Sequence, residues 1–247
     1  IRLAKTAGFC FGVNRAVELT YGLLAEGYKV ATLGPLIHNP QAVEDMQRKG
    51  AQVVDTVQDV PAGYEVVIRS HGVPRSVYDE LTARGIRYHD ATCPFVQKIQ
   101  RIAAEAEKAG AVLLVAGDKT HPEVQGIVGH TRGEVFVFAD LAELKAWKGP
   151  SDPQKPLFAV AQTTFQVTKW QESSEFLKKA YTNARIFDTI CNATWARQQE
   201  AEDLSQKCDI VVVIGGHHSS NTQKLVQVAA RHTRAVTVET ASELRPE

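Results

Sequence analysis

The stretch DATCPFVQKIQRIAAEAEKAGAVLLVAGDKTH, residues 90–121, decides the fold of this chain of 247 residues. Cys93 leads into an amphipathic stretch from Val96 to Ala109, which predicts a helix, and the apolar run AVLLVAG then predicts a buried strand. His121 follows in a polar loop, 28 residues after Cys93. A helix, a strand and a polar loop in this order indicate one unit of an α/β fold with a parallel sheet.

The same order of features occurs twice more at the same spacing. Cys10, in GFCFGV, lies 28 residues before His38, and Cys191, in DTICNAT, lies 28 residues before Ser219. The helices predicted after these two cysteines span residues 14–26 and 194–206. After each polar loop the chain continues with another helix and another strand. Equal intervals between chemically distinctive residues indicate three copies of one structural unit.

The repeat predicts three small α/β lobes with parallel sheets in a pseudo-threefold arrangement. The predicted lobes span residues 11–92, 93–187 and 188–247. The first two end in strands that lead to the next cysteine, IRYHDATC and ARIFDTIC, whereas the third stops before such a strand. Because the chain begins with IRLAKTAGFC, we expect residues 1–10 to be the strand that completes the third lobe. The pattern also predicts that a further strand and polar loop are missing after Glu247.

Composition and charge argue against several classes of protein. The chain is 44% apolar, and its 28 basic and 28 acidic residues leave no formal net charge. No basic stripe favours nucleic acid, and the longest apolar runs, AVLLVAG and DIVVVIGG, are too short to span a membrane. The four cysteines contain no C-x-x-C pair and no signal peptide is visible. We therefore expect a cytoplasmic protein and no disulfide scaffold.

The three repeated cysteines, Cys10, Cys93 and Cys191, each follow a predicted strand. Ligand loops of parallel α/β units lie at the carboxyl ends of strands, so three lobes around one axis would bring these thiolates to a common centre. Three thiolates without a fourth favour an iron–sulfur cluster with one open iron. A zinc ion with water as its fourth ligand is the alternative. Cys208 has no counterpart in the other units, and we expect it to be structural.

A second set of polar residues follows the strands, in the loops IHNP, SHGVP, THPEV, AQTTF and HHSSNT. Imidazoles, hydroxyls, an amide and helix N-termini in these loops would together bind a diphosphate. His38, His71 and His121 occupy matching places in the repeat, which favours a shared site. For Thr163, Thr164, Ser220 and Asn221, taken one by one, helix capping is the alternative role.

Glu123 is the acidic residue that stands out in these loops. It follows Pro122 at the start of a predicted helix, where a carboxylate ordinarily complements the helix dipole. It also lies two residues from His121, in a loop expected to face the cysteines. This position makes Glu123 the candidate proton donor.

Eight motifs, in this order, carry a resemblance to a known family. They are AGFCFGVNRAV, LGPLIHNPQ, IRSHGVP, DATCPFV, HPEVQG, AQTT, DTICNATWARQ and GGHHSSNTQKL. Over essentially its whole length the chain resembles the LytB/IspH family of 4-hydroxy-3-methylbut-2-enyl diphosphate reductases. The resemblance implies a three-lobed α/β protein around a [4Fe–4S] cluster with three cysteine ligands and one open iron.

The resemblance also implies an activity, and a role for each candidate residue. The expected reaction is the reductive dehydroxylation of an allylic alcohol diphosphate to isopentenyl and dimethylallyl diphosphate, the last step of the non-mevalonate isoprenoid pathway. The substrate hydroxyl would bind the open iron, and reduced ferredoxin or flavodoxin would supply the electrons. The implied cluster ligands are Cys10, Cys93 and Cys191. The implied catalytic residues are Glu123 as proton donor, Thr163 as the residue that orients the hydroxyl, and His121. The implied diphosphate and substrate contacts are His38, His71, His121, Thr163, Ser219, Ser220 and Asn221.

Two other functions stay open at this point. A zinc-dependent hydrolase acting on a phosphorylated metabolite would use the histidines, but it would not explain why no histidine takes one of the three equivalent cysteine places. A non-catalytic sensor or binding protein would hold the same cluster. The sequence also departs from the family in one respect, since no Gly-Ala-Ser-type loop with a diphosphate-binding serine follows Glu247.

Overall fold

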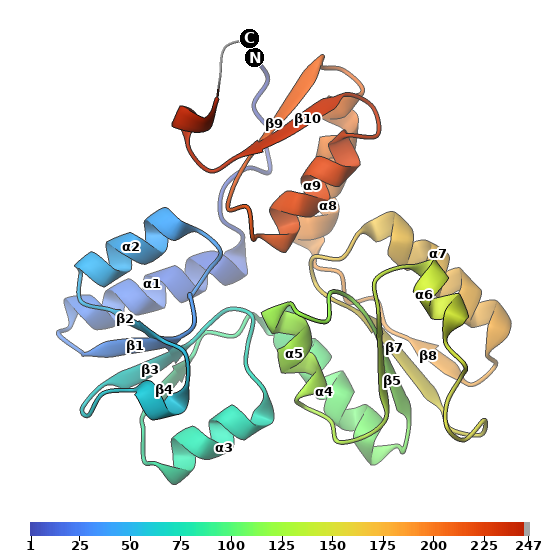
Figure 1. Ribbon diagram of the computed structural model, residues 1–247, viewed down its shortest axis with the longest axis horizontal. Coiled ribbons are helices and arrows are strands. Elements are labelled where there is room, and N and C mark those ends of the chain that lie inside the picture. The colour runs from blue at the N-terminus through green and yellow to red at the C-terminus, as the bar shows by residue number, and fades with distance from the viewer. Residues whose placement is uncertain (245–247) are drawn as a thin grey trace.

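The structure, a computed structural model, describes residues 1–244 and contains three parallel sheets. Figure 1 shows the sheets, each with its own helices, as three lobes arranged around a common centre. All strand pairs of the described residues are parallel. The α/β class, the parallel sheets and the three-lobed arrangement that the repeat predicted are therefore confirmed.

The first sheet has the strand order β2-β1-β3-β4, and apolar clusters cover both of its faces. Its lobe contains α1 (Phe11–Ala25), β1 (Val30–Leu33), α2 (Pro40–Arg48), β2 (Gln52–Val54), η1 (Val57–Asp59), β3 (Glu65–Ile68), α3 (Arg75–Ala83) and β4 (Tyr88–Asp90). Val67 of β3 shares a core with Leu23 of α1, whereas Val66 and Ile68 share a core with Leu81 of α3. This alternation follows from the two-residue period of a strand, which sends neighbouring side chains to opposite faces.

The second sheet repeats this order as β6-β5-β7-β8. Its lobe contains α4 (Pro94–Lys108), β5 (Val112–Ala116), α5 (Pro122–Val128), β6 (Val135–Phe138), α6 (Leu141–Ala146), β7 (Leu157–Ala161), α7 (Val167–Ala180) and β8 (Ala184–Ile186). The central strands β5 and β7 are buried along their full length. Continuous apolar strands of this kind are typical of parallel sheets that are covered on both faces.

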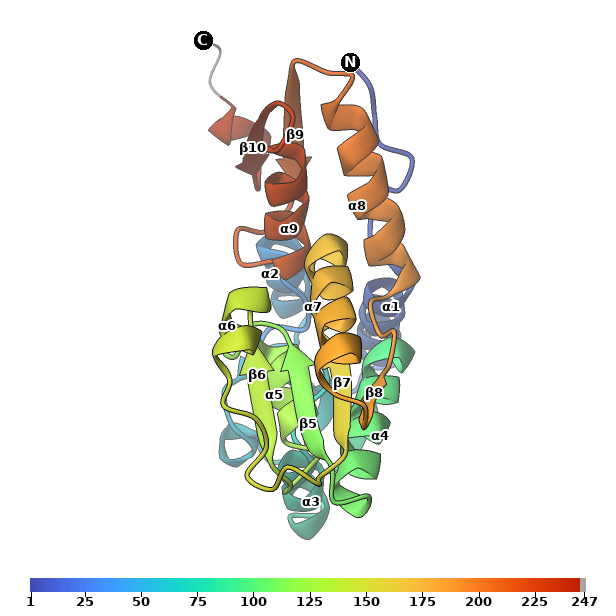
Figure 2. The same ribbon diagram turned by 90° about the vertical axis from the view of Figure 1, so that its right-hand side faces the viewer.

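The third sheet is two-stranded within the described residues. Its lobe contains α8 (Asn192–Ser205), β9 (Ile210–Ile214), α9 (Ser220–Ala229), β10 (Arg234–Val238) and η2 (Ala241–Glu243). The two helices pack against each other (Figure 2). Three apolar side chains of β9 are left exposed, because this sheet is narrower than the other two; they are Ile210, Val212 and Ile214.

Residues 1–10 contain no strand, so the prediction that an N-terminal strand completes the third lobe is wrong. In the first two sheets the strand before the cysteine, β4 or β8, pairs with the third strand of its unit. The third sheet has no such partner strand within residues 1–244, and a lone segment cannot form a ladder. Instead, the Glu200 carboxylate of α8 accepts hydrogen bonds from the backbone N–H groups of Lys5 and Thr6 at 2.7 and 2.8 Å. The further strand and loop predicted after Glu247 lie outside the described residues.

The helices after the three cysteines begin two or three residues earlier than the sequence pattern predicted, at Phe11, Pro94 and Asn192. In α4 the first buried apolar side chain is Val96, so the apolar periodicity does not reveal the first two residues of the helix. The early start places each cysteine directly before a helix. None of the described helices is long and apolar enough to cross a membrane.

Candidate active site

Cys10, Cys93 and Cys191 are the N-cap residues of α1, α4 and α8. Cys93 and Cys191 follow β4 and β8, at the carboxyl ends of strands where parallel sheets carry their ligand loops. All three line one cavity of about 290 Å³, here called the central cavity. Cys208 is not among its lining residues. The structure thus brings together the three cysteines that the equal spacing singled out.

The three thiols lie near one another and are all free. Gly12, in the first turn of α1, approaches Cys93 so closely that a Cβ there would lie 2.6 Å from Sγ. Burial raises the pKa of the Cys93 thiol, and the charges of Cys10 and Cys191 add to that rise. A thiol with a raised pKa keeps its proton at neutral pH unless a cation displaces it. Three cysteine thiols that line one cavity, one of them with a raised pKa, favour a positively charged centre between them.

The spacing of the sulfurs fits a cluster better than a single ion. Thiolates around one tetrahedral zinc ion, with Zn–S bonds near 2.3 Å, lie about 3.8 Å apart. Within residues 1–244, two groups of three residues have donor atoms that all lie within 4.8 Å of one another, and neither group contains a cysteine. At least two of the three Sγ atoms therefore lie more than 4.8 Å apart, which is further than a tetrahedral zinc ion places its ligands. This favours an iron–sulfur cluster, which is a larger unit, over the zinc alternative.

Glu123 lies in the first turn of α5, lines the central cavity and is 2% exposed. The Thr163 backbone N–H donates to Glu123 Oε1 at 2.6 Å, and the Thr163 hydroxyl donates to Oε2 at 2.7 Å. Thr163 thus binds the carboxylate and does not cap α7, whose N-cap is Gln166. Burial raises the pKa of the Glu123 carboxyl to about 7, although the hydrogen bonds from Thr163 lower it. A carboxyl with this pKa can hold and release a proton near neutral pH.

Three histidines, here called the histidine cluster, meet on the wall of the central cavity. The ring centroids of His38 and His71 lie 4.6 Å apart, and His121 lies 5.5 Å from each of them. Burial lowers the pKa of all three rings, to about 4 for His121, and nearby positive charges lower it further. At neutral pH each ring is therefore uncharged and has one N–H group to donate.

The protonation pattern of the histidine cluster favours an anion over a metal ion. His121 Nδ1 accepts a hydrogen bond from the Glu123 backbone N–H at 3.1 Å, so the proton of the neutral ring is on Nε2. His38 Nε2 and His71 Nδ1 are buried and have no hydrogen-bond partner among residues 1–244. The donor atoms of the cluster lie within 4.8 Å of one another. A metal ion would need a free lone pair on the His121 ring. Nδ1 already accepts the hydrogen bond from Glu123, and Nε2 carries the ring proton.

The loop before α9 adds hydroxyl and amide groups to the central cavity. Ser219 is the N-cap of α9, and its Oγ accepts a hydrogen bond from the Thr222 backbone N–H at 3.3 Å. Ser220 and Asn221 follow in the first turn and line the cavity, so capping is the role of Ser219 and not of these two. Thr164 Oγ1 donates to Ser220 Oγ at 2.9 Å, which joins the second lobe to the third.

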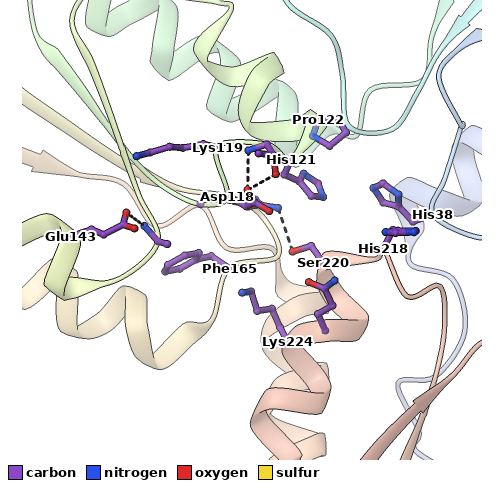
Figure 3. A pocket seen from close by; sticks show the side chains of 15 residues that line it. His38, Asp118, Lys119, His121, Pro122, Glu143, Phe165, His218, Ser220 and Lys224 are labelled. Atoms are coloured by element: carbon purple, nitrogen blue, oxygen red, sulfur yellow. Dashed lines mark hydrogen bonds between the residues drawn. The ribbon is translucent and has the colours of Figure 1, made fainter. Parts of the chain in front are cut away.

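A second cavity of about 560 Å³, here called the side cavity, adjoins the central one. The two cavities share His38, His121 and Ser220 among their lining residues. Figure 3 shows His38 and His218 on one side of the side cavity, and Lys224 reaching into it from α9. Burial lowers the pKa of Lys224. The side cavity is lined by two basic residues, Lys119 and Lys224, and two acidic residues, Asp118 and Glu143.

Sequence reasoning missed two residues, one that contacts Cys93 and one whose charge lowers the pKa of the histidine cluster. The contact of Gly12 with Cys93 could not have been predicted, because it joins the first turn of α1 to the N-cap residue of α4. Arg69 follows the buried strand β3, and its Nε is buried without a hydrogen-bond partner. A signal for Arg69 was present in the sequence, since a cation at the end of the apolar run VVI is rarely left unpaired when buried.

Known proteins resemble this chain over its full length. A family model described as LytB protein matches residues 1–247. The 4-hydroxy-3-methylbut-2-enyl diphosphate reductase of Thermoanaerobacter sp. (strain X514) is 40% identical over 249 residues, which cover 99% of this chain and 85% of that protein. The protein of the same name from Nautilia profundicola is 38% identical over 250 residues, which cover 100% of this chain and 88% of the relative.

Solved structures agree with these matches. The E-1-hydroxy-2-methyl-but-2-enyl-4-diphosphate reductase from Plasmodium falciparum aligns with a TM-score of 0.89 at 27% identity, over 96% of this chain and 75% of that one. A structure of (E)-4-hydroxy-3-methyl-but-2-enyl diphosphate reductase, described as the terminal enzyme of the non-mevalonate pathway, aligns with a TM-score of 0.71 at 35% identity. That alignment covers 100% of this chain and 88% of the other. The chain therefore belongs to the LytB family.

Proposed function

We propose that this chain catalyses the reductive dehydroxylation of 4-hydroxy-3-methylbut-2-enyl diphosphate to isopentenyl and dimethylallyl diphosphate, the last step of the non-mevalonate isoprenoid pathway. The observation that carries the proposal is that three free cysteines, a buried acid with a pKa of about 7 and the histidine cluster all line the central cavity. Relatives at 40% identity bear the name of this enzyme. The reaction takes up two electrons and two protons, breaks the allylic carbon–oxygen bond and releases the hydroxyl as water.

Cys10, Cys93 and Cys191 would hold a [4Fe–4S] cluster in which one iron has no protein ligand. The all-sulfur donor set and a sulfur spacing wider than zinc requires support this assignment. Such a cluster would supply electrons and would polarise the substrate hydroxyl as a Lewis acid.

Glu123 would hold the proton that the departing hydroxyl needs, at one of its carboxyl oxygens. Thr163 would orient that carboxyl, and its own hydroxyl, toward the substrate alcohol. His121 supports the same step, because its bond to the Glu123 backbone fixes the first turn of α5 and leaves Nε2–H free to donate. The raised pKa of Glu123 keeps part of the population protonated at neutral pH.

The diphosphate would bind on the polar wall of the central cavity. The contacts would come from His38, His71, His121, Thr163, Ser219, Ser220 and Asn221. The N-terminus of α9, a helix of ten residues, begins at this wall and favours negative charge there. The two unpartnered imidazole nitrogens, His38 Nε2 and His71 Nδ1, would gain a hydrogen bond in the complex.

Reduced ferredoxin or flavodoxin would supply the electrons, and the expected location is the cytoplasm. Both statements rest on the family resemblance. The division into lobes 11–92, 93–187 and 188–247, with residues 1–10 beside the third, is proposed because each of these ranges contains one of the three sheets.

The test is turnover of the allylic diphosphate by oxygen-free, cluster-loaded protein with chemically reduced methyl viologen. Formation of both isopentenyl and dimethylallyl diphosphate is the expected result. A fully loaded protein that forms neither product contradicts the proposal and favours the sensor. Release of phosphate by a zinc-loaded protein would favour the hydrolase.

A further inference from the structure

Arg15 connects the segments that carry the first two cysteines of the central cavity. It lies on α1, five residues after Cys10. Its Nη1 donates a hydrogen bond to the Thr92 carbonyl at 3.0 Å, and its Nη2 donates to the Asp90 carbonyl at 3.1 Å. Thr92 directly precedes Cys93, so the helix that follows one cysteine holds the backbone that leads to the next.

Arg197 makes the same kind of contact between the third cysteine and the first. It lies on α8, six residues after Cys191, and lines the central cavity. Its Nε donates to the Thr6 carbonyl at 3.1 Å, and its Nη2 donates to the Gly8 carbonyl at 2.6 Å. Both carbonyls belong to the segment that leads to Cys10. As in the contact made by α1, one guanidinium bridges two carbonyls that lie two residues apart.

Lys98 provides the third contact of this kind. It lies on α4, five residues after Cys93, and its Nζ donates to the Asp188 carbonyl at 3.4 Å. Asp188 lies three residues before Cys191. With this contact the set is closed: α1 holds the segment before α4, α4 holds the segment before α8, and α8 holds the segment before α1.

The three side chains, here called the cation ring, are held in place without being neutralised. None of them forms an ion pair with an acidic residue within residues 1–244. Their acceptors are backbone carbonyls, which bind a charged donor strongly but carry no net charge of their own. Each thiolate that binds a cluster brings a negative charge to the central cavity. Unneutralised cations beside the cysteine segments suit a site of that charge.

We propose that Arg15, Lys98 and Arg197 are positioning residues that together set the separation of the three thiols for the cluster. One cluster needs sulfurs from three separate segments at fixed distances from one another. The cation ring links these segments pairwise, because each cation starts from the helix after one cysteine and holds the backbone before the next. The assignment rests on the proposed function for the identity of the cluster, and it adds to that function the residues that arrange the ligands.

The test compares R15M, R197M and K98M with the wild type, all loaded with iron and sulfide without oxygen. R15K and R197K are the conservative variants. R101M is the matched control, because Arg101 is exposed on the same helix as Lys98 and has no hydrogen bond or ion pair in the described part of the chain. Two quantities are measured for each protein: the rate at which a chelator removes iron, followed by visible absorbance, and the melting temperature of the loaded and the unloaded form.

In R15M and R197M, we expect iron to be lost about 10-fold faster or more, because each variant lacks two charge-assisted hydrogen bonds to a cysteine segment. K98M should show a smaller acceleration, since it lacks one longer bond. R15K and R197K should recover part of the wild-type rate, because lysine keeps the charge but does not bridge two carbonyls as the guanidinium does. R101M should lose iron at the wild-type rate. Loading should raise the melting temperature of the wild type by more than that of R15M or R197M.

Two results would overturn the cation ring while the proposed function stands. One is a wild-type rate of iron loss in both R15M and R197M. The other is a melting temperature that falls by the same amount in the loaded and unloaded forms of these variants, because that pattern marks a role in the fold alone. If neither arginine variant folds, K98M decides, since it changes an exposed residue: iron loss at the wild-type rate contradicts the assignment and faster loss supports it. A wild-type protein that takes up no iron and sulfide overturns the proposed function itself, and the cation ring with it.

Discussion

Thr163 binds the Glu123 carboxylate through two separate groups, its backbone N–H at 2.6 Å and its hydroxyl at 2.7 Å. The two residues lie on different elements, since Thr163 follows β7 and Glu123 lies in the first turn of α5. Burial raises the pKa of the carboxyl, while the two hydrogen bonds favour its charged form and limit the rise. The pair therefore sets both the position of the acid and the pH range in which it carries a proton.

Glu123→Gln should reduce turnover by about 100-fold or more, which is the scale of lost general acid catalysis. The amide keeps the shape of the carboxyl but cannot supply its proton. Iron content and the visible spectrum should match the wild type, because Glu123 is not a proposed cluster ligand. Steady-state kinetics and iron analysis check this. Glu143→Gln, at an exposed residue whose carboxylate accepts from the Ala139 N–H, is the control. Near-normal turnover in Glu123→Gln would remove the residue from its proposed role.

Thr163→Ala should lower turnover about 10-fold and move the loss of activity to higher pH. The acid must be protonated, so activity falls as the pH rises through the pKa of about 7. Loss of the hydroxyl removes a hydrogen bond that favours the charged carboxylate, so the pKa of Glu123 rises. Thr163→Ser keeps a hydroxyl and should restore both the rate and the pH profile. A shift of the Thr163→Ala profile to lower pH is incompatible with this account.

The titration of Glu123 should also appear in the stability of the protein. Its pKa of about 7 in the folded state lies above the reference value of 4.5, so the folded state binds this proton more tightly than the unfolded state does. The stability gained is fully present below pH 4.5 and is lost as the pH rises through 7. Over that range the wild type should lose about 3 kcal/mol in free energy of unfolding relative to Glu123→Gln. Parallel stability curves for the two proteins would show that the carboxyl titrates normally.

Gly12→Ala should lower the iron content, because a Cβ at this position would lie 2.6 Å from Cys93 Sγ and force the thiol to move. The control is Gly22→Ala in the same helix, where a Cβ meets no atom within 4 Å. Alanine favours a helix over glycine, so Gly22→Ala should be at least as stable as the wild type and keep its iron. Iron analysis of both variants after identical anaerobic loading checks this. Equal iron in the two would mean that Gly12 does not shape the cysteine site.

Cys208→Ser should keep the full iron content, whereas Cys93→Ser should lose most of it. Cys208 is absent from the lining of the central cavity, and Cys93 shares that cavity with the other two candidate ligands. Iron and sulfide analysis of the two serine variants provides the comparison. Loss of iron in Cys208→Ser would show that the structural assignment of this cysteine is wrong.

Much of the fold was predictable because the repeat appears in the positions of the cysteines and polar loops as well as in the apolar periodicity. Cys10, Cys93 and Cys191 each precede a helix directly, and the helices and strands that follow are of nearly equal length, 15, 15 and 14 residues for the helices and 4, 5 and 5 for the strands. The same regularity led to the wrong prediction that residues 1–10 form a strand of the third sheet. A strand depends on its neighbour as much as on its own sequence, and the described part of the third sheet offers this segment no partner.

The candidate site was predictable as a set of residues but not as a set of interactions. Every site residue that the family resemblance implied lines the central cavity. The bond from Thr163 to Glu123 joins residues 40 positions apart, and no local pattern encodes it. The fit of Gly12 against Cys93 is likewise a property of packing between elements. Sequence periodicity reports which face of an element is buried, and not which atom of another element it meets.

The measurement that tests the central claim most directly is the iron, acid-labile sulfide and zinc content of the wild-type protein purified without oxygen. Three cysteines that line one cavity, and whose Sγ atoms do not all lie within 4.8 Å of one another, should hold about four iron and four sulfide ions per chain. A colourless protein with one zinc ion per chain and no sulfide would contradict the account.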